Sequence, residues 1–80
     1  MGNKSDGFYL NTNIKYLRKK RKESQEQLAK IINKKGNAIG NYEKGIRNPD
    51  YVDIYYIAMH FGVSIEELIK KDFRKEGKYY

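Results

Sequence analysis

Apolar residues recur at helical spacing in five short stretches of this chain, and turn signals separate the stretches. Ile14 and Leu17 form the inner face of the first stretch. Three residues suited to cap a helix precede them, namely Asn11, Thr12 and Asn13. The second stretch opens with Ser24 and, three residues later, Gln27, the pattern of a capping box. Its apolar residues are Leu28, Ala29, Ile31 and Ile32, and Asn33 can adopt the left-handed backbone of a helix exit.

A third helix is expected from Gly36 to Lys44, with Ile39 and Tyr42 facing inward and Gly45 ending it. Pro49 fits the first turn of a fourth helix, since proline is favoured there. The inward residues of this helix are expected to be Tyr51, Ile54, Ile57, Ala58 and Phe61. After a turn at Gly62 and Val63, Ser64 caps a fifth helix that carries Ile65, Leu68 and Ile69.

This pattern predicts a compact all-α domain of five helices over residues 11–70. A flexible arm, residues 1–10, precedes it, and a charged and aromatic tail, residues 71–80, follows it. A single proline, Pro49, and well-spaced turn signals favour an all-helical domain with short connections.

The charge of the chain suggests an anionic partner. Seventeen Lys and Arg against ten Asp and Glu give a net charge of +7. On so small a domain this favours nucleic acid, although such a charge can also serve solubility alone. Because there is no cysteine and His60 is the single histidine, we expect no metal and no cofactor. No segment reaches the roughly 20 apolar residues of a membrane span, and no signal peptide is visible, so a cytoplasmic protein is expected.

The residue patterns of enzymes are missing from the sequence. No carboxylates are paired in an apolar setting, no serine has a base near it, and Gly36 and Gly40 do not form a phosphate-binding loop. We therefore expect a protein that is not an enzyme. The two glycines nevertheless cost the third helix about 1 kcal/mol each relative to alanine. Either they let the backbone approach DNA closely, or they occupy surface positions that tolerate any residue.

Residues 13–69 resemble the lambda-repressor/Cro-like helix-turn-helix family, also called XRE. The matching residues are Ile14, Leu17, Arg18, Ser24, Gln25, Leu28, Ala29, Ile39, Tyr42, Glu43, Gly45, Pro49, Gly62, Val63, Ser64 and Leu68. The resemblance implies a sequence-specific transcriptional regulator, such as a repressor, whose third helix enters the major groove of double-stranded DNA. It also implies an ion pair between Arg18 and Glu43 that ties the first helix to the third.

The resemblance further implies which residues meet DNA. Base-reading positions fall on Gly36, Asn37 and Asn41, with Lys35 at the entrance of the helix. Asparagine suits this role because it can bond two atoms of adenine. Phosphate contacts are implied for Gln25, Lys44, Arg47 and Asn48. The basic run of Lys19, Lys20, Arg21 and Lys22 contributes either to the electrostatic field or to a solvated face only.

Two residues in the turn depart from the family pattern. Lys34 replaces a residue that normally plugs the turn into the core, so its stem is expected to lie along apolar surface with the ammonium outside. Lys35 replaces a capping hydroxyl, which leaves the first amides of the third helix less well satisfied.

Proteins of this kind commonly bind a palindromic operator as dimers, and we expect a homodimer here. The surfaces considered for it are the fifth helix, the tail and the arm, through Phe73, Tyr79, Tyr80, Phe8 and Tyr9. No small-molecule effector is evident, and Tyr55 and Tyr56 are given no chemical role. The alternative function is a protein-interaction module, such as an antitoxin or an anti-repressor partner, that uses the same fold.

Overall fold

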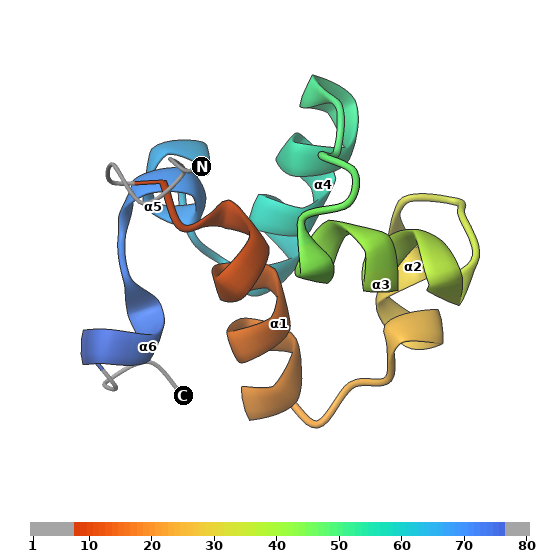
Figure 1. Cartoon of the computed structure of the whole chain (residues 1–80), viewed down its shortest axis with the longest axis horizontal. Helices are drawn as coiled ribbons and strands as arrows, with labels where there is room; N and C mark the ends of the chain where they lie inside the picture. Colours follow the sequence, from red (N-terminus) through yellow and green to blue (C-terminus); the bar gives the residue numbers. More distant parts are fainter. Residues whose placement is uncertain (1–7, 77–80) are drawn as a thin grey trace.

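A computed structural model of the chain describes residues 8–76 and shows six helices (Figure 1). They are α1 (Leu10–Lys20), α2 (Gln25–Ile31), α3 (Gly36–Lys44), α4 (Tyr51–Phe61), α5 (Ile65–Lys70) and α6 (Phe73–Glu76). No strand occurs between residues 8 and 76. The all-α prediction is confirmed, and the predicted number of five helices is wrong by one, because the short helix α6 follows α5.

The core lies between α1 and the helices around it. α1 packs against α3, α5 and α6, while α2 contacts α3 and α4. Every helix contributes at least one buried apolar residue. The set is Ile14, Leu17, Leu28, Ala29, Ile32, Ile39, Tyr42, Ile57, Ala58, Phe61, Leu68 and Phe73. The periodic pattern thus predicted most of the core correctly.

The start of α1 differs from the prediction. Tyr9 occupies the cap position without a side-chain cap bond, and Asn13 lies inside the helix, fully buried. The Asn13 amide donates to the carbonyls of Leu68 at 2.8 Å and Lys71 at 2.5 Å. Its Oδ1 accepts from the amide of Phe73 at 3.3 Å. Asn13 is therefore not a cap but a buried polar link from α1 to the C-terminal part of the domain.

The predicted start of α2, end of α3 and start of α5 are confirmed. Ser24 and Gln27 form the capping box of α2, with bonds of 3.0 and 2.7 Å. Asn33 has φ of 59°, and Gly45 ends α3 with φ of 78°. Ser64 caps α5 in a second capping box.

α4 begins later than predicted, and Tyr51 is the one predicted inward residue that faces outward, while Ile57, Ala58 and Phe61 are buried and Ile54 packs against the core. Asp50 is its N-cap and accepts from the amide of Asp53 at 2.9 Å, so Pro49 precedes the helix and does not start it. Tyr51 is exposed, because Asp53 takes the buried position in the first turn of α4. Ile31, predicted inward on α2, is exposed as well.

Part of the predicted tail belongs to the core. Phe73, which begins α6, is fully buried, so a second copy of the chain cannot contact it in the folded domain. Tyr79, Tyr80 and residues 1–7 of the predicted arm lie outside the described residues. Within residues 8–76, no helix is long and apolar enough to cross a membrane.

Candidate nucleic-acid interface

The side of α3 that faces away from the core carries polar residues. Ile39 and Tyr42 point into the core, and Asn37, Asn41 and Lys44 lie on the opposite side at helical spacing. Asn37 and Lys44 are exposed, and Asn41 is half-buried. The structure thus brings two of the predicted base-reading residues and one predicted phosphate contact to one face of one helix.

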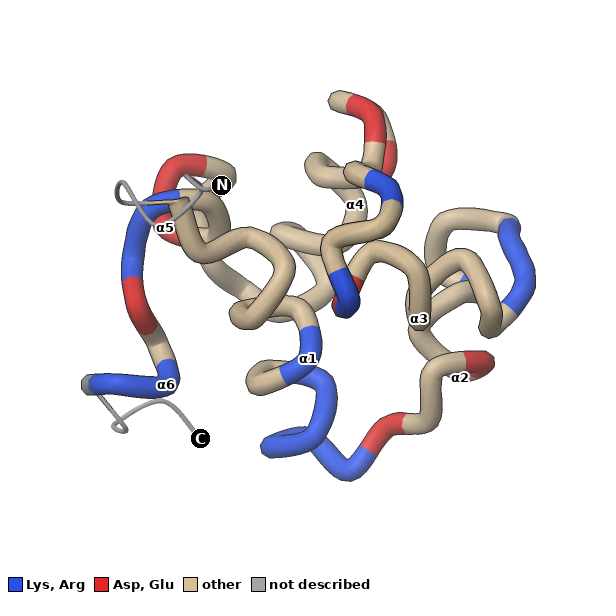
Figure 2. The backbone as a smooth tube through the Cα atoms, in the orientation of Figure 1, with Lys and Arg blue, Asp and Glu red and all other residues tan. Residues whose placement is uncertain are grey.

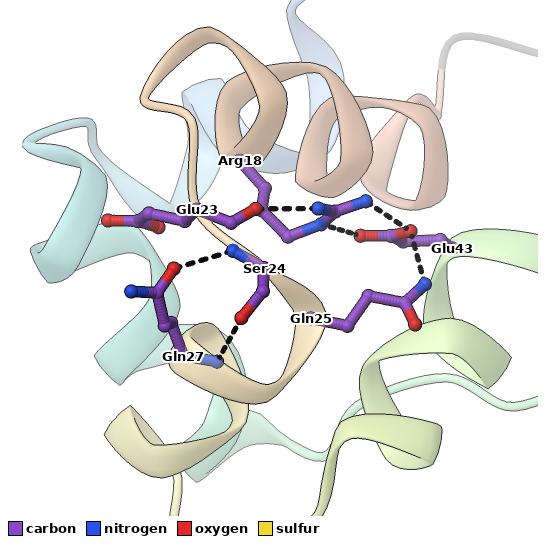
Figure 3. Close-up of polar contacts among 6 residues, drawn as sticks. All are labelled: Arg18, Glu23, Ser24, Gln25, Gln27 and Glu43. Carbon is purple, nitrogen blue, oxygen red and sulfur yellow. Dashed lines mark hydrogen bonds and ion pairs between the residues drawn. The ribbon is translucent and has the colours of Figure 1, made fainter.

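An ion pair fixes α3 against α1, as Figure 3 shows. The Arg18 Nε lies 2.6 Å from one carboxylate oxygen of Glu43, and a terminal nitrogen donates to the other at 3.2 Å. Arg18 also donates to the carbonyl of Glu23 at 2.7 Å. The two side chains are only 9% and 4% exposed. The pair predicted from the resemblance is present, and its bidentate geometry holds the two helices at a defined angle.

Gln25 extends this network toward the outward face of α3. Its Nε2 donates to Glu43 at 3.1 Å (Figure 3). The amide nitrogen carries a second hydrogen, which can be donated to a phosphate oxygen. The Arg18–Glu43 pair therefore orients the predicted phosphate contact.

The two glycines of α3 face α2. A Cβ at Gly36 would lie 3.4 Å from the backbone of Glu26, and a Cβ at Gly40 would lie 3.4 Å from the Gln25 amide. A side chain larger than a methyl group at Gly36 would therefore have to bend away from the backbone of α2, whereas one at Gly40 would have to displace the Gln25 side chain. Neither interpretation made from the sequence included this packing of α2 on α3, because the crossing point of the helices is a tertiary feature.

A basic groove runs beside α3 between α1 and the start of α2. Its volume is about 250 Å³, and its lining includes Lys15, Lys19, Lys44 and Gln25. Sequence reasoning gave Lys15 no role and left Lys19 within a charge run. The signal that could have found them is their spacing of four, which places both on one side of α1. Glu43 in the same lining is neutralised by Arg18.

Of the basic run at the end of α1, Lys19 is the residue in the lining of this groove. Lys20 lies 5.8 Å from the ring of Tyr16. Arg21 donates to the carbonyl of His60 at 2.6 Å, and His60 lies 2.7 Å from Glu23. These contacts tie the α1–α2 connection to the end of α4. Across residues 8–76, no group of three potential metal-ligating side chains occurs.

The loop after α3 is anchored at its base. The amides of Ile46 and Arg47 donate to the carbonyl of Asn41 at 3.0 and 3.3 Å. Asn11 on α1 donates to the carbonyl of Tyr42 at 2.6 Å, a contact not predicted from the sequence. The side chains of Arg47 and Asn48 are exposed beyond this anchor.

The turn between α2 and α3 is held by a buried carboxylate. The Lys34 ammonium lies 2.7 Å from Asp53, and the Tyr42 hydroxyl donates to the same oxygen at 3.0 Å. Asp53 is buried, whereas the Lys34 side chain is half-exposed. The Lys34 ammonium, which was predicted to lie outside the core, therefore pairs with a specific carboxylate of α4. Lys35 makes no side-chain cap bond, as expected.

This cluster makes stability sensitive to high pH. Burial and the hydrogen bond to Asp53 raise the pKa of Tyr42, and the bond to Asp53 raises the pKa of Lys34. The unfolded groups therefore lose their protons first, from about pH 10 upward. We expect the free energy of unfolding to hold below that pH and to fall above it. Urea titrations from about pH 8 to about pH 11 measure this dependence. In Tyr42→Phe, the free energy of unfolding should decrease less at high pH than in the wild type. Tyr51→Phe, which changes an exposed tyrosine, is the control and should show the same decrease as the wild type. If Tyr42→Phe also shows the wild-type decrease, Tyr42 is not the source of the pH dependence.

Comparisons with known proteins agree with this geometry. The helix-turn-helix family model HTH_3 matches residues 14–68, more than two-thirds of the chain. The P22 c2 repressor protein, solved in complex with a synthetic operator, is 25% identical, with a TM-score of 0.74 over 79% of this chain and 96% of that one. The restriction-modification controller protein C.AhdI from Aeromonas hydrophila is 28% identical, with a TM-score of 0.68 over 80% of this chain and 97% of that one. No curated protein matches the sequence.

The fold also occurs as part of an enzyme. Hydroxypropylphosphonic acid epoxidase from S. wedmorenis matches 84% of this chain with a TM-score of 0.70, at 20% identity. The match covers 36% of the epoxidase chain, so it shows a shared fold alone.

Proposed function

The chain belongs to the helix-turn-helix family, and from this membership we propose that it regulates transcription by binding a specific DNA sequence with α3 in the major groove. The observation that carries the proposal is the outward face of α3. Asn37, Asn41 and Lys44 share this face, and a bidentate ion pair between Arg18 and Glu43 orients it. A base-reading helix needs such an orientation, because specific hydrogen bonds to base edges tolerate little misplacement.

We assign base reading to Asn37 and Asn41, with Lys35 at the helix entrance. Asn41 is half-buried on the outward face of α3, and its side-chain amide offers both a donor and an acceptor to a base edge. Gly36 and Gly40 line the border of α3 with α2, so they limit bulk near DNA and offer no side-chain contact.

Phosphate contacts are assigned to both sides of α3. Gln25 and Lys44 share the basic groove with Lys15 and Lys19, and Arg47 and Asn48 extend from the loop after the helix. Such contacts set register and supply affinity that falls with salt. In this proposal Lys15 and Lys19 add two phosphate contacts to those implied by the resemblance.

The regulator is proposed to act as a repressor that binds a palindromic operator as a dimer. The P22 c2 protein, a repressor crystallised with an operator, supports this choice at 25% identity. Binding both half-sites would require the two α3 helices to lie about 34–36 Å apart, one turn of DNA. The protein is proposed to have no enzymatic activity.

Selection of duplexes from a random pool tests the proposed function. At two salt concentrations, the wild-type protein should enrich a palindrome with half-sites about one helical turn apart. Binding that depends on salt with no enriched sequence would contradict base reading by α3. It would favour the alternative, a protein-interaction module with a basic face.

Asn41→Ala should relax the preference at one base position of each half-site. The expected loss is about 1–3 kcal/mol for the preferred base, with non-specific binding nearly unchanged. Lys44→Ala on the same face is the comparison. It should weaken binding to all sequences alike and lower the salt slope by about one. If Asn41→Ala also weakened all sequences uniformly, Asn41 would contact the backbone and not a base.

A further inference from the structure

The outer face of α4 is apolar along its whole length. Five exposed side chains, which we call the α4 stripe, cover it: Tyr51, Val52, Tyr55, Tyr56 and Met59. At about 100° per residue, these positions fall within an arc of about 140°. The opposite side of the helix holds the core residues Ile57, Ala58 and Phe61. The stripe residues were given no function from the sequence, and none lines the basic groove.

A helix with apolar residues on both sides is typical of a helix that is covered on both sides. The core covers one side of α4, and the stripe lies on the other. Single exposed apolar residues need no explanation, whereas a continuous group of this size is often functional. Tyrosine is also enriched at protein interfaces, because its ring buries area while its hydroxyl can stay wet.

We propose that the α4 stripe is the surface on which a second copy of this chain docks. The distribution of charge selects this partner. The chain carries a net charge of +7, yet α4 contains neither Lys nor Arg (Figure 2). Two copies can therefore meet at this face without bringing lysines or arginines of α4 together. A nucleic acid or an acidic partner would be attracted to the basic surfaces elsewhere.

A two-fold axis perpendicular to α4 makes the two copies of the helix antiparallel. The Asp50 end of one copy then lies near the His60 end of the other. At the His60 end, Glu23 lies 2.7 Å from His60 and 3.9 Å from Arg21, so this end carries no excess of positive charge. Tyr55, the middle position of the stripe from Tyr51 to Met59, would then lie at the axis and meet the same residue of the second copy.

The area fits a small dimer interface. With about 150–250 Å² for an aromatic side chain, the exposed parts of the stripe amount to roughly 500 Å² on each copy. A standard interface buries about 800 Å² per partner. The exposed Ile46, in the loop that leads into α4, adds further apolar area.

The molar mass in solution, measured by light scattering over a series of concentrations, tests the inference. The wild-type chain should approach twice its 9.5 kDa at high concentration. Tyr55→Glu and Tyr55→Lys, measured separately, should each remain monomeric, since like charges would meet at the axis. An equimolar mixture of the two should restore the dimer. Phe8→Glu introduces the same charge at an exposed aromatic residue outside the stripe and should dimerise like the wild type.

Circular dichroism of each variant separates unfolding from loss of assembly. A folded Tyr55→Glu that stays dimeric, or a wild-type chain that stays monomeric, would overturn the inference. If the wild-type chain is dimeric while both single variants and their mixture are monomeric, the antiparallel pairing at Tyr55 would be overturned.

The inference rests on the proposed function only for the need to bring two copies together. The mass measurement contains no DNA, so the two can fail separately. A monomer that enriches a DNA sequence would overturn the α4 interface and leave the proposed function standing. A dimer that enriches no sequence would do the opposite.

Discussion

Replacing Glu43 with alanine is expected to lower the free energy of unfolding by about 3–5 kcal/mol, because it leaves the buried guanidinium of Arg18 without its carboxylate. A domain of this size has a total stability on the order of 5–15 kcal/mol or less, so the variant should be close to unfolded at room temperature. The side chains are 9% and 4% exposed, so solvent can compensate only in part. Urea unfolding followed by circular dichroism measures the change.

A double replacement separates the lost charge pair from the loss of packing. Arg18→Met with Glu43→Leu removes both charges and keeps apolar volume, and it should recover most of the stability. The double variant should still bind DNA poorly, because Gln25 loses its acceptor and α3 loses its angular restraint. A stability loss in Glu43→Ala below about 1 kcal/mol would show that the pair behaves like an exposed one.

The sequence was sufficient to predict the features that depend on local chemistry. Capping boxes, the left-handed Asn33 and the end of α3 at Gly45 all follow from short-range rules. The core positions follow from helical spacing, and the Arg18–Glu43 pair followed from the family resemblance, which no spacing rule would have supplied. For the same reason, the roles of Asn37 and Asn41 rest on the resemblance and on their position on α3.

Two of the errors, at Asn13 and in the first turn of α4, share a physical cause, since each involves a polar residue whose partner is distant in sequence. Asn13 has the chemistry of a cap but bonds to carbonyls 55 and 58 residues away. Tyr51 was expected to face inward and Asp53 was given no role, because only the fold brings Lys34 and Tyr42 to Asp53. The burial of Asp53 in turn determines that Tyr51 faces outward. The rest of the α4 stripe faces outward because Ile57, Ala58 and Phe61 occupy the buried side of the helix.

Phe73 was expected in the tail, and its replacement tests how far the folded domain extends. Its ring is fully buried where α6 packs on α1, and its amide donates to Asn13. Phe73→Ala should therefore cost about 3–5 kcal/mol, the range for deleting a buried aromatic ring. The exposed Phe8 provides the matched control, since Phe8→Ala should stay within about 0.5 kcal/mol of the wild type. Thermal unfolding of both variants gives the comparison.

The size of the Phe73 effect also bears on DNA binding. α6 contacts α1, and α1 holds Arg18, Lys15 and Lys19. If Phe73→Ala loosens α1, binding should weaken at temperatures where the variant is still largely folded, because the phosphate contacts and the restraint on α3 share that helix. A variant that loses stability but binds DNA at full strength below its unfolding temperature would show that α6 stabilises the domain without positioning its interface. Equal stability of Phe73→Ala and Phe8→Ala would show that α6 is not part of the folded core at all.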